Sequence, residues 1–146
     1  MNRIEKKVKE TELLYGTAEP ADIYEKMGII TVEHELPMCV NGFTITMNGM
    51  LFVVLNSELD YYRKRVTMAH ELGHIILHKG TNSIELSCNT SFCVSRYERE
   101  ADSFAVYLLM HSVLSQRDSF ESLTAEEISM LAHIPMDMVE RAFEEL

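Results

Sequence analysis

The sequence lacks any long apolar run. Its uninterrupted apolar runs, such as the one from Met50 to Leu55, are far shorter than the roughly 20 residues that cross a membrane as a helix. The chain begins MNRIEKKVKE, which is mostly charged and unlike the apolar stretch of a signal peptide. We therefore expect a cytoplasmic protein without a membrane segment.

Cysteine is also scarce. The chain has three, Cys39, Cys88 and Cys93, and this odd count without a secretion signal predicts reduced thiols rather than a disulfide framework. The C-x-x-x-x-C spacing of Cys88 and Cys93 could ligate a metal, but loop thiols are the simpler interpretation.

Basic residues are outnumbered by acidic ones. The chain has 13 lysines and arginines against 23 aspartates and glutamates, a formal net charge of −10. Affinity for DNA or RNA rests largely on basic residues that neutralise phosphates, so direct nucleic-acid binding is disfavoured and a basic protein is the better partner. With 47% hydrophobic residues among 146, the chain suits one globular domain with its own core.

The first third of the chain predicts two helices followed by strands. The helices are expected over residues 3–16 and 20–27, where a proline opens the second and a glycine follows it. Two runs rich in β-branched and aromatic residues come next, IITVE and FTITMNGMLFVVL. Asn48-Gly49 between apolar segments is a strong hairpin signal, so we expect a small antiparallel sheet.

The middle of the chain predicts a helix and then a loop. The helix is expected from Tyr61 to His78, with Ser57 or Asp60 as its N-cap. Residues 81–95 are rich in serine, threonine and asparagine, which is typical of a loop.

The last third of the chain is predicted to be helical. Apolar and small residues recur at helical spacing in RYEREADSFAVYLLMH, which starts at Arg96. Two short helices are expected to part near Ile134-Pro135, and Thr124 and Glu127 form a capping box at the start of the first.

The run TMAHELGHIILH has the pattern with the clearest chemistry. His70 and His74 are four residues apart, so they share one face of a helix and can both direct a ring nitrogen at one ion. A metal lowers the pKa of a water bound to it to about 7, and Glu71 is placed to take a proton from that water. Histidines that are only hydrogen-bonded can show the same pattern, so the interpretation depends on a third ligand.

His78 continues the spacing, but we do not expect it to be that ligand. His70 and His78 are about 12 Å apart along the helix axis, whereas zinc–nitrogen bonds are about 2 Å long. The longer metzincin pattern is absent as well, because Leu77 and Gly80 occupy the positions of its glycine and third histidine.

The helix predicted from Arg96 supplies better candidates. Glu98 and Asp102 are four residues apart and share a face with two alanines, which would let this helix pack closely on the motif helix. Glu100 lies about 200° round the helix from Glu98 and is expected to face water near Arg96. We predict Glu98 as the third ligand and Asp102 as the acceptor of a ligating histidine's free N–H, against the alternative of solvated acids on an ordinary amphipathic helix.

These motifs resemble the ImmA/IrrE metallopeptidases. Besides RVTMAHELGHIILH, the run EREADSFAVYLLM, which starts 24 residues beyond His74, is similar to the family signature E-x-E-A-[DN]-x-F-A-x-x-L-L-M. The resemblance covers Ile29 to Met110, and the terminal run TAEEISMLAHIPMDMVERAF looks like the helix-turn-helix-like segment of the family. His111 stands where the signature usually has proline.

The resemblance implies an α+β fold in two parts. Residues 1–111 would form a zincin-like, gluzincin-type metallopeptidase core with a small antiparallel sheet, and residues 112–146 a helical helix-turn-helix-like segment packed on it. The chain looks like the short form, without the sensor domain of the longer IrrE branch.

The resemblance also implies an activity. The metal, Zn²⁺ or else Mn²⁺ or iron, which the same donors accept, would lie on His70, His74 and Glu98, with Glu71 as general base. Members of the family cleave a helix-turn-helix transcriptional repressor and so release mobile-element or stress genes. Tyr61, Tyr62 and His78 are candidates for a further oxyanion donor.

Two other interpretations stay open. A DNA-binding role for the C-terminal residues 121–146 is disfavoured, because Arg141 is the single base there among seven acids, and a protein-docking role is expected instead. A non-catalytic regulatory protein, or a toxin–antitoxin component, that binds a helix-turn-helix partner is the alternative to a peptidase. The seven acids of residues 121–146 are Glu121, Glu126, Glu127, Asp137, Glu140, Glu144 and Glu145.

Overall fold

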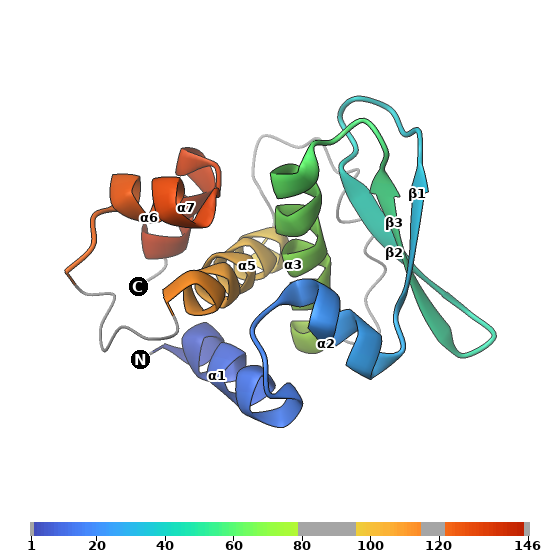
Figure 1. The fold of residues 1–146 in the computed structure, drawn as a ribbon, viewed down its shortest axis with the longest axis horizontal. Helices are drawn as coiled ribbons and strands as arrows, with labels where there is room; N and C mark the ends of the chain where they lie inside the picture. The colour runs from blue at the N-terminus through green and yellow to red at the C-terminus, as the bar shows by residue number, and fades with distance from the viewer. Residues whose placement is uncertain (1, 79–95, 115–121, 145–146) are drawn as a thin grey trace.

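The protein has an α+β fold, seen in a computed structural model that describes residues 2–78, 96–114 and 122–144 (Figure 1). A three-stranded mixed sheet lies at one end of the described residues, and helices make up the rest. The predicted loop over 81–95, with Cys88 and Cys93, lies outside the described residues. The elements are α1 (Arg3–Tyr15), α2 (Pro20–Met27), β1 (Ile30–His34), β2 (Gly42–Met47), β3 (Met50–Asn56), α3 (Tyr61–Leu77), α5 (Arg96–Leu114), α6 (Ala125–Ala132) and α7 (Met136–Glu144).

The two N-terminal helices agree with the prediction from sequence. The Asn2 side chain accepts a hydrogen bond from the Glu5 backbone N–H and so caps α1. Helix α2 spans the predicted residues, with Pro20 in its first turn and Gly28 just after its end. The buried hydroxyl of Tyr24 donates a hydrogen bond to the Met68 carbonyl at 2.6 Å, which fastens α2 to α3.

The sheet confirms the predicted hairpin but not the predicted strand pairing. Strands β2 and β3 pair antiparallel across Asn48 and Gly49, both at positive φ. Strand β1 pairs in parallel with β3, so the expectation of a purely antiparallel sheet was wrong. After β1, the segment over 35–41 leads the chain to β2 at the other edge of the sheet, and the hairpin then places β3 in the centre. No local pattern in the sequence predicts this strand order.

Helix α3 packs directly on α5. Asp60 caps α3 by accepting a hydrogen bond from the Arg63 backbone N–H at 2.8 Å. Of the two predicted N-cap residues, Ser57 and Asp60, the structure has the second. A Cβ added at Gly73 would lie 3.1 Å from the backbone of Ala101 and from the Phe104 side chain. The glycine of α3 therefore meets the small residue of α5, which confirms the predicted close approach of the two helices.

Helix α5 lies at the centre of the helical part, where Phe104 and Leu108 are fully buried. It continues through His111 to Leu114, so the histidine that replaces proline does not end it. The predicted boundary at residue 111 thus falls in the last turn of α5, and the division into two parts stays a prediction. Helix α6 has the predicted capping box of Thr124 and Glu127, and α7 packs against α5.

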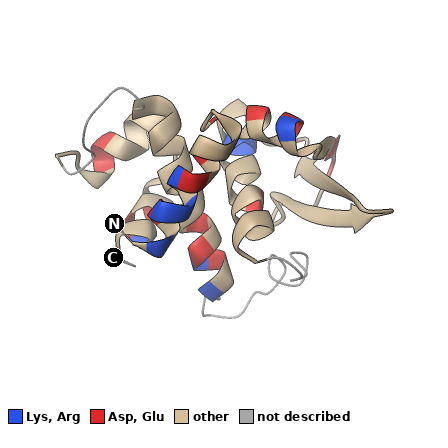
Figure 2. Cartoon of the chain, turned by 90° about the horizontal axis from the view of Figure 1, so that it is seen from below, with Lys and Arg blue, Asp and Glu red and all other residues tan. Residues whose placement is uncertain are grey.

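Lysine, arginine, aspartate and glutamate residues are concentrated on the helices (Figure 2). Among the residues of the three strands, Glu33 is the single aspartate, glutamate, lysine or arginine. In the described part of the chain, no helix is long and apolar enough to cross a membrane.

Candidate metal centre

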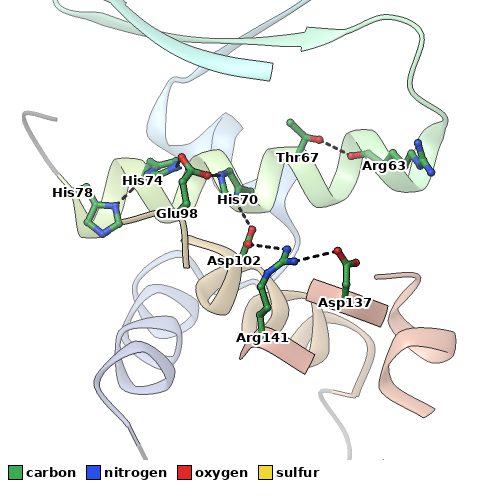
Figure 3. A network of polar contacts seen from close by, with 9 residues as sticks. All are labelled: Arg63, Thr67, His70, His74, His78, Glu98, Asp102, Asp137 and Arg141. Atoms are coloured by element: carbon green, nitrogen blue, oxygen red, sulfur yellow. Dashed lines mark hydrogen bonds and ion pairs between the residues drawn. The ribbon is translucent and has the colours of Figure 1, made fainter. Parts of the chain in front are cut away.

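Two histidines of α3 and one glutamate of α5 converge on one point (Figure 3). His74 Nε2 lies 3.1 Å from His70 Nε2 and 3.1 Å from Glu98 Oε1. His70 Nε2 lies 3.0 Å from Glu98 Oε2. The i, i+4 spacing brings the two rings together, and the approach of α5 at Gly73 brings Glu98 to them.

The spacing of these donor atoms fits a metal ion. Ligand bonds of about 2.0–2.1 Å in a tetrahedral site place neighbouring donors about 3.3 Å apart, close to the separations observed. Two imidazole nitrogens and a carboxylate are donors that zinc accepts, and three protein ligands leave one tetrahedral position open. Among the described residues, His70, His74 and Glu98 form the one group of this kind.

The electrostatics of the metal-free site favour a cation at the same place. Burial disfavours a charged His70, but hydrogen bonds with Asp102 and Glu98 outweigh it and raise its pKa to about 10. Burial also opposes ionisation of Glu98, yet its hydrogen bonds with His70 and His74 hold its pKa below the ordinary value. Without metal, a proton on His70 therefore takes the place that a metal cation would fill.

Asp102 orients the ring of His70. Its Oδ1 lies 2.8 Å from His70 Nδ1, so the Nδ1–H donates to the carboxylate and Nε2 is left to face the metal position. The other oxygen, Oδ2, accepts a hydrogen bond at 3.2 Å from Arg141 Nη2 of α7, and Arg141 also pairs with Asp137. Figure 3 shows this line of contacts running from α3 to the C-terminal helix.

Glu71 directly follows the candidate ligand His70 on α3 and is 1% exposed. Its Oε2 accepts a hydrogen bond from the Thr44 hydroxyl of β2 at 2.8 Å. Burial raises the pKa of the Glu71 carboxyl, which makes it a stronger base than an exposed glutamate. The buried position and the threonine contact give this carboxylate a fixed orientation.

A cleft of about 310 Å³ opens over these residues. It is lined by His70, Glu71 and Glu98, by the chain around Gly42 at the start of β2, and by Arg141 of α7. A Cβ at Gly42 would lie 2.6 Å from the Val54 carbonyl oxygen, so the glycine lets β2 start close against its neighbours. The cleft therefore lies between the sheet and the C-terminal helices, and His70 and Glu98 line it, whereas His74 is buried behind them.

Glu100 does not face water as expected. It is 8% exposed and pairs with Arg3 of α1 and with Arg96, and His78 Nε2 lies 3.3 Å from its Oε2. Burial opposes its ionisation, but these three partners hold its pKa below the ordinary value. The helical-face argument correctly separated Glu100 from Glu98, but it could not show that α1 covers this side of α5.

The three candidate oxyanion donors are not among the residues that line the cleft. Tyr61 is 69% exposed, Tyr62 stacks on His133 of the C-terminal segment, and both nitrogens of His78 face other side chains.

Sequence reasoning missed Thr44 and Arg141. Nothing in the residue pattern of β2 relates Thr44 to Glu71, which lies 27 residues later in the sequence. Arg141 did have a signal, since it is the single base of an acidic segment, but its place in the cleft depends on how α7 packs on α5.

Comparisons with known proteins agree with the geometry. Residues 25–141 match the IrrE N-terminal-like domain. Immunity region protein 2 of Bacillus phage phi105 is 30% identical over 125 residues, which cover 85% of this chain and 78% of the phage protein. No solved structure matches the chain significantly. The chain belongs to the IrrE N-terminal-like family of metallopeptidases.

Proposed function

We propose that the protein is a zinc-dependent endopeptidase with a zincin-like core of the gluzincin type. The observation that carries the proposal is the convergence of His70 Nε2, His74 Nε2 and Glu98 beside the buried carboxylate of Glu71. Because the same donors accept manganese or iron, elemental analysis of the purified protein identifies the metal.

The residues around the cleft suit peptide hydrolysis. A bound zinc would supply Lewis acidity, which acidifies water and polarises a peptide carbonyl. Glu71 takes the proton of the attacking water and passes it to the leaving amine. The Thr44 hydroxyl donates a hydrogen bond to Oε2 of Glu71 and so keeps the carboxylate in place.

Glu71→Gln tests the role of the general base. The amide keeps the size of the side chain but cannot take a proton, so cleavage should fall about a hundredfold to ten-thousandfold. Zinc content should stay that of the wild type, because Glu71 is outside the donor group. Cleavage at the wild-type rate by a contaminant-free variant would contradict the role.

A helix-turn-helix transcriptional repressor is the proposed substrate, cleaved so as to release mobile-element or stress genes. The resemblance of the two motif runs to the ImmA/IrrE metallopeptidases supports this substrate class. The name of the phage relative, an immunity region protein, accords with a mobile-element setting. Incubation with the product of a neighbouring repressor gene, followed by mass spectrometry of the fragments, tests the proposal and locates the scissile bond.

Helices α6 and α7 form the proposed docking surface for that repressor. They present exposed acids beside Met130, which is 76% exposed, and this combination suits a basic helical protein. Reversing the charge at Glu126, Glu127 and Glu140 should weaken capture of the repressor, with the larger effect at low salt. Binding that is unchanged at low salt would contradict the docking surface.

A non-catalytic protein that binds a helix-turn-helix partner, as in a toxin–antitoxin pair, is the competing function. The hydrogen bond that holds Glu71 beside the metal ligands favours the peptidase, because a purely structural metal site has no use for that carboxylate. Binding of the repressor without any cleavage, by protein loaded with one metal, would favour the competitor.

A further inference from the structure

The ring of His78 lies against the metal ligand His74 and not against the metal position. His74 Nδ1 and His78 Nδ1 are 3.1 Å apart, and the second nitrogen of His78, Nε2, lies 3.3 Å from Glu100 Oε2. Both nitrogens of His78 are thus engaged by other side chains (Figure 3 shows the first contact). Neither is available to a metal or a substrate.

The direction of these hydrogen bonds follows from the metal site. Nε2 of His74 must be unprotonated to bind a metal, so its single ring proton lies on Nδ1 and is donated to His78. His78 Nδ1 is then the acceptor, its own proton lies on Nε2, and that N–H donates to the Glu100 carboxylate. One chain of hydrogen bonds therefore leads from the ligand to a carboxylate.

The far end of this chain is firmly held. His74, His78 and Glu100 are 4%, 7% and 8% exposed, so water competes little for their hydrogen bonds. Glu100 is paired with Arg3 of α1 and Arg96 of α5, which keep the carboxylate charged and in place. Tyr97 packs its ring against His78, with the centroids 4.7 Å apart.

We propose that His78 and Glu100 are positioning residues for the metal, which act by orienting the ligand His74. This pair is the relayed support, and Asp102 on His70 is the direct support. The inference rests on the proposed metal site. A carboxylate behind a ligating histidine fixes its tautomer and raises its basicity, and loss of such a partner typically weakens metal binding about tenfold to a hundredfold.

The test is the zinc affinity of the full chain, measured by competition with a chromogenic chelator. His78→Phe keeps the bulk of the ring but cannot accept from His74, so zinc should bind about tenfold to a hundredfold more weakly. His78→Gln has a carbonyl that can accept from His74 and an amide that can donate to Glu100, so it should recover part of the loss. Glu100→Gln should weaken zinc binding as well, through His78.

A double variant separates a relay from two independent effects. If Glu100 acts through His78, then His78→Phe with Glu100→Gln should bind zinc no more weakly than His78→Phe alone. The matched control is His111→Gln, because His111 is also a buried histidine paired with a carboxylate, Glu12, but lies outside the donor group. Its zinc affinity should stay within about twofold of the wild type.

Thermal unfolding of each metal-free variant, monitored by circular dichroism, shows whether a loss of packing alone explains the weaker zinc binding. The inference is overturned if His78→Phe and Glu100→Gln bind zinc like the wild type, or if the two effects simply add. Should His78→Phe fail to fold, His78→Gln and Glu100→Gln decide in the same way. A wild type that binds no zinc would instead contradict the proposed function.

Discussion

The two histidines of the metal centre are held in different ways. His70 has Asp102 directly behind it, in a position that lines the cleft and is linked through Arg141 to α7. His74 has His78 behind it and Glu100 behind that, in a position covered by α1 through Arg3. The direct support thus connects the candidate ligands to the cleft, and the relayed support connects them to the buried side of the molecule.

This difference separates two tasks. A support that lines the cleft can respond to a substrate, because Arg141 both contacts Asp102 and borders the space where a peptide would lie. The relayed support consists of His78 and Glu100, which are both buried, so it can keep a ligand in place but cannot contact a substrate. Variants of the direct support should therefore change catalysis and metal affinity together, whereas variants of the relayed support should change metal affinity alone.

The largest effect is expected from disrupting the contact between α3 and α5, because both supports depend on that contact. Gly73→Val would place a side chain where even a Cβ lies 3.1 Å from Ala101 and Phe104, and so push α5 away from α3. We expect the free energy of unfolding to fall by about 1–3 kcal/mol and zinc binding to be lost with the alignment of Glu98. Denaturant unfolding and zinc titration measure the two effects, and a variant with wild-type zinc affinity would show that the close approach is not needed.

Asp102→Ala should give the next largest effect. His70 loses its acceptor, and we expect zinc affinity to fall about tenfold to a hundredfold. The cleavage rate at saturating zinc should fall as well, because Arg141 loses its partner at the edge of the cleft. Glu100→Gln is the matched comparison, and a fall in its cleavage rate at saturating zinc would contradict the separation of the two tasks.

A change of a single pH unit is expected to have a smaller effect. The pKa of His70 is raised from 6.5 to about 10 without metal, so zinc must displace a proton, and its affinity should rise about tenfold per pH unit between pH 6 and 8. The raised pKa stabilises the metal-free fold below pH 6.5, and this contribution is lost as the pH rises toward about 10. Calorimetry in buffers of different ionisation enthalpy counts the proton, and a count of zero would contradict this description.

The sequence predicted what depends on local spacing. A period of 3.6 residues was enough to place His70 and His74 on one face and to separate Glu98 from Glu100. The small residues of α5 correctly predicted its close approach to α3.

What the sequence could not predict depends on contacts between distant segments. Glu100 is buried because Arg3, 97 residues away, covers it. The parallel pairing of β1 with β3 and the approach of Arg141 to Asp102 also depend on how separate elements pack, and no periodicity reports that packing.

The most direct test of the account compares the metal content of the wild type with Glu98→Ala and Glu100→Ala, purified under matched conditions and measured by elemental analysis. We predict one metal ion in the wild type, none in Glu98→Ala, and a metal that is retained but more weakly bound in Glu100→Ala. A wild type without metal, or metal lost from Glu100→Ala and kept by Glu98→Ala, would contradict the central claim that His70, His74 and Glu98 form the metal centre.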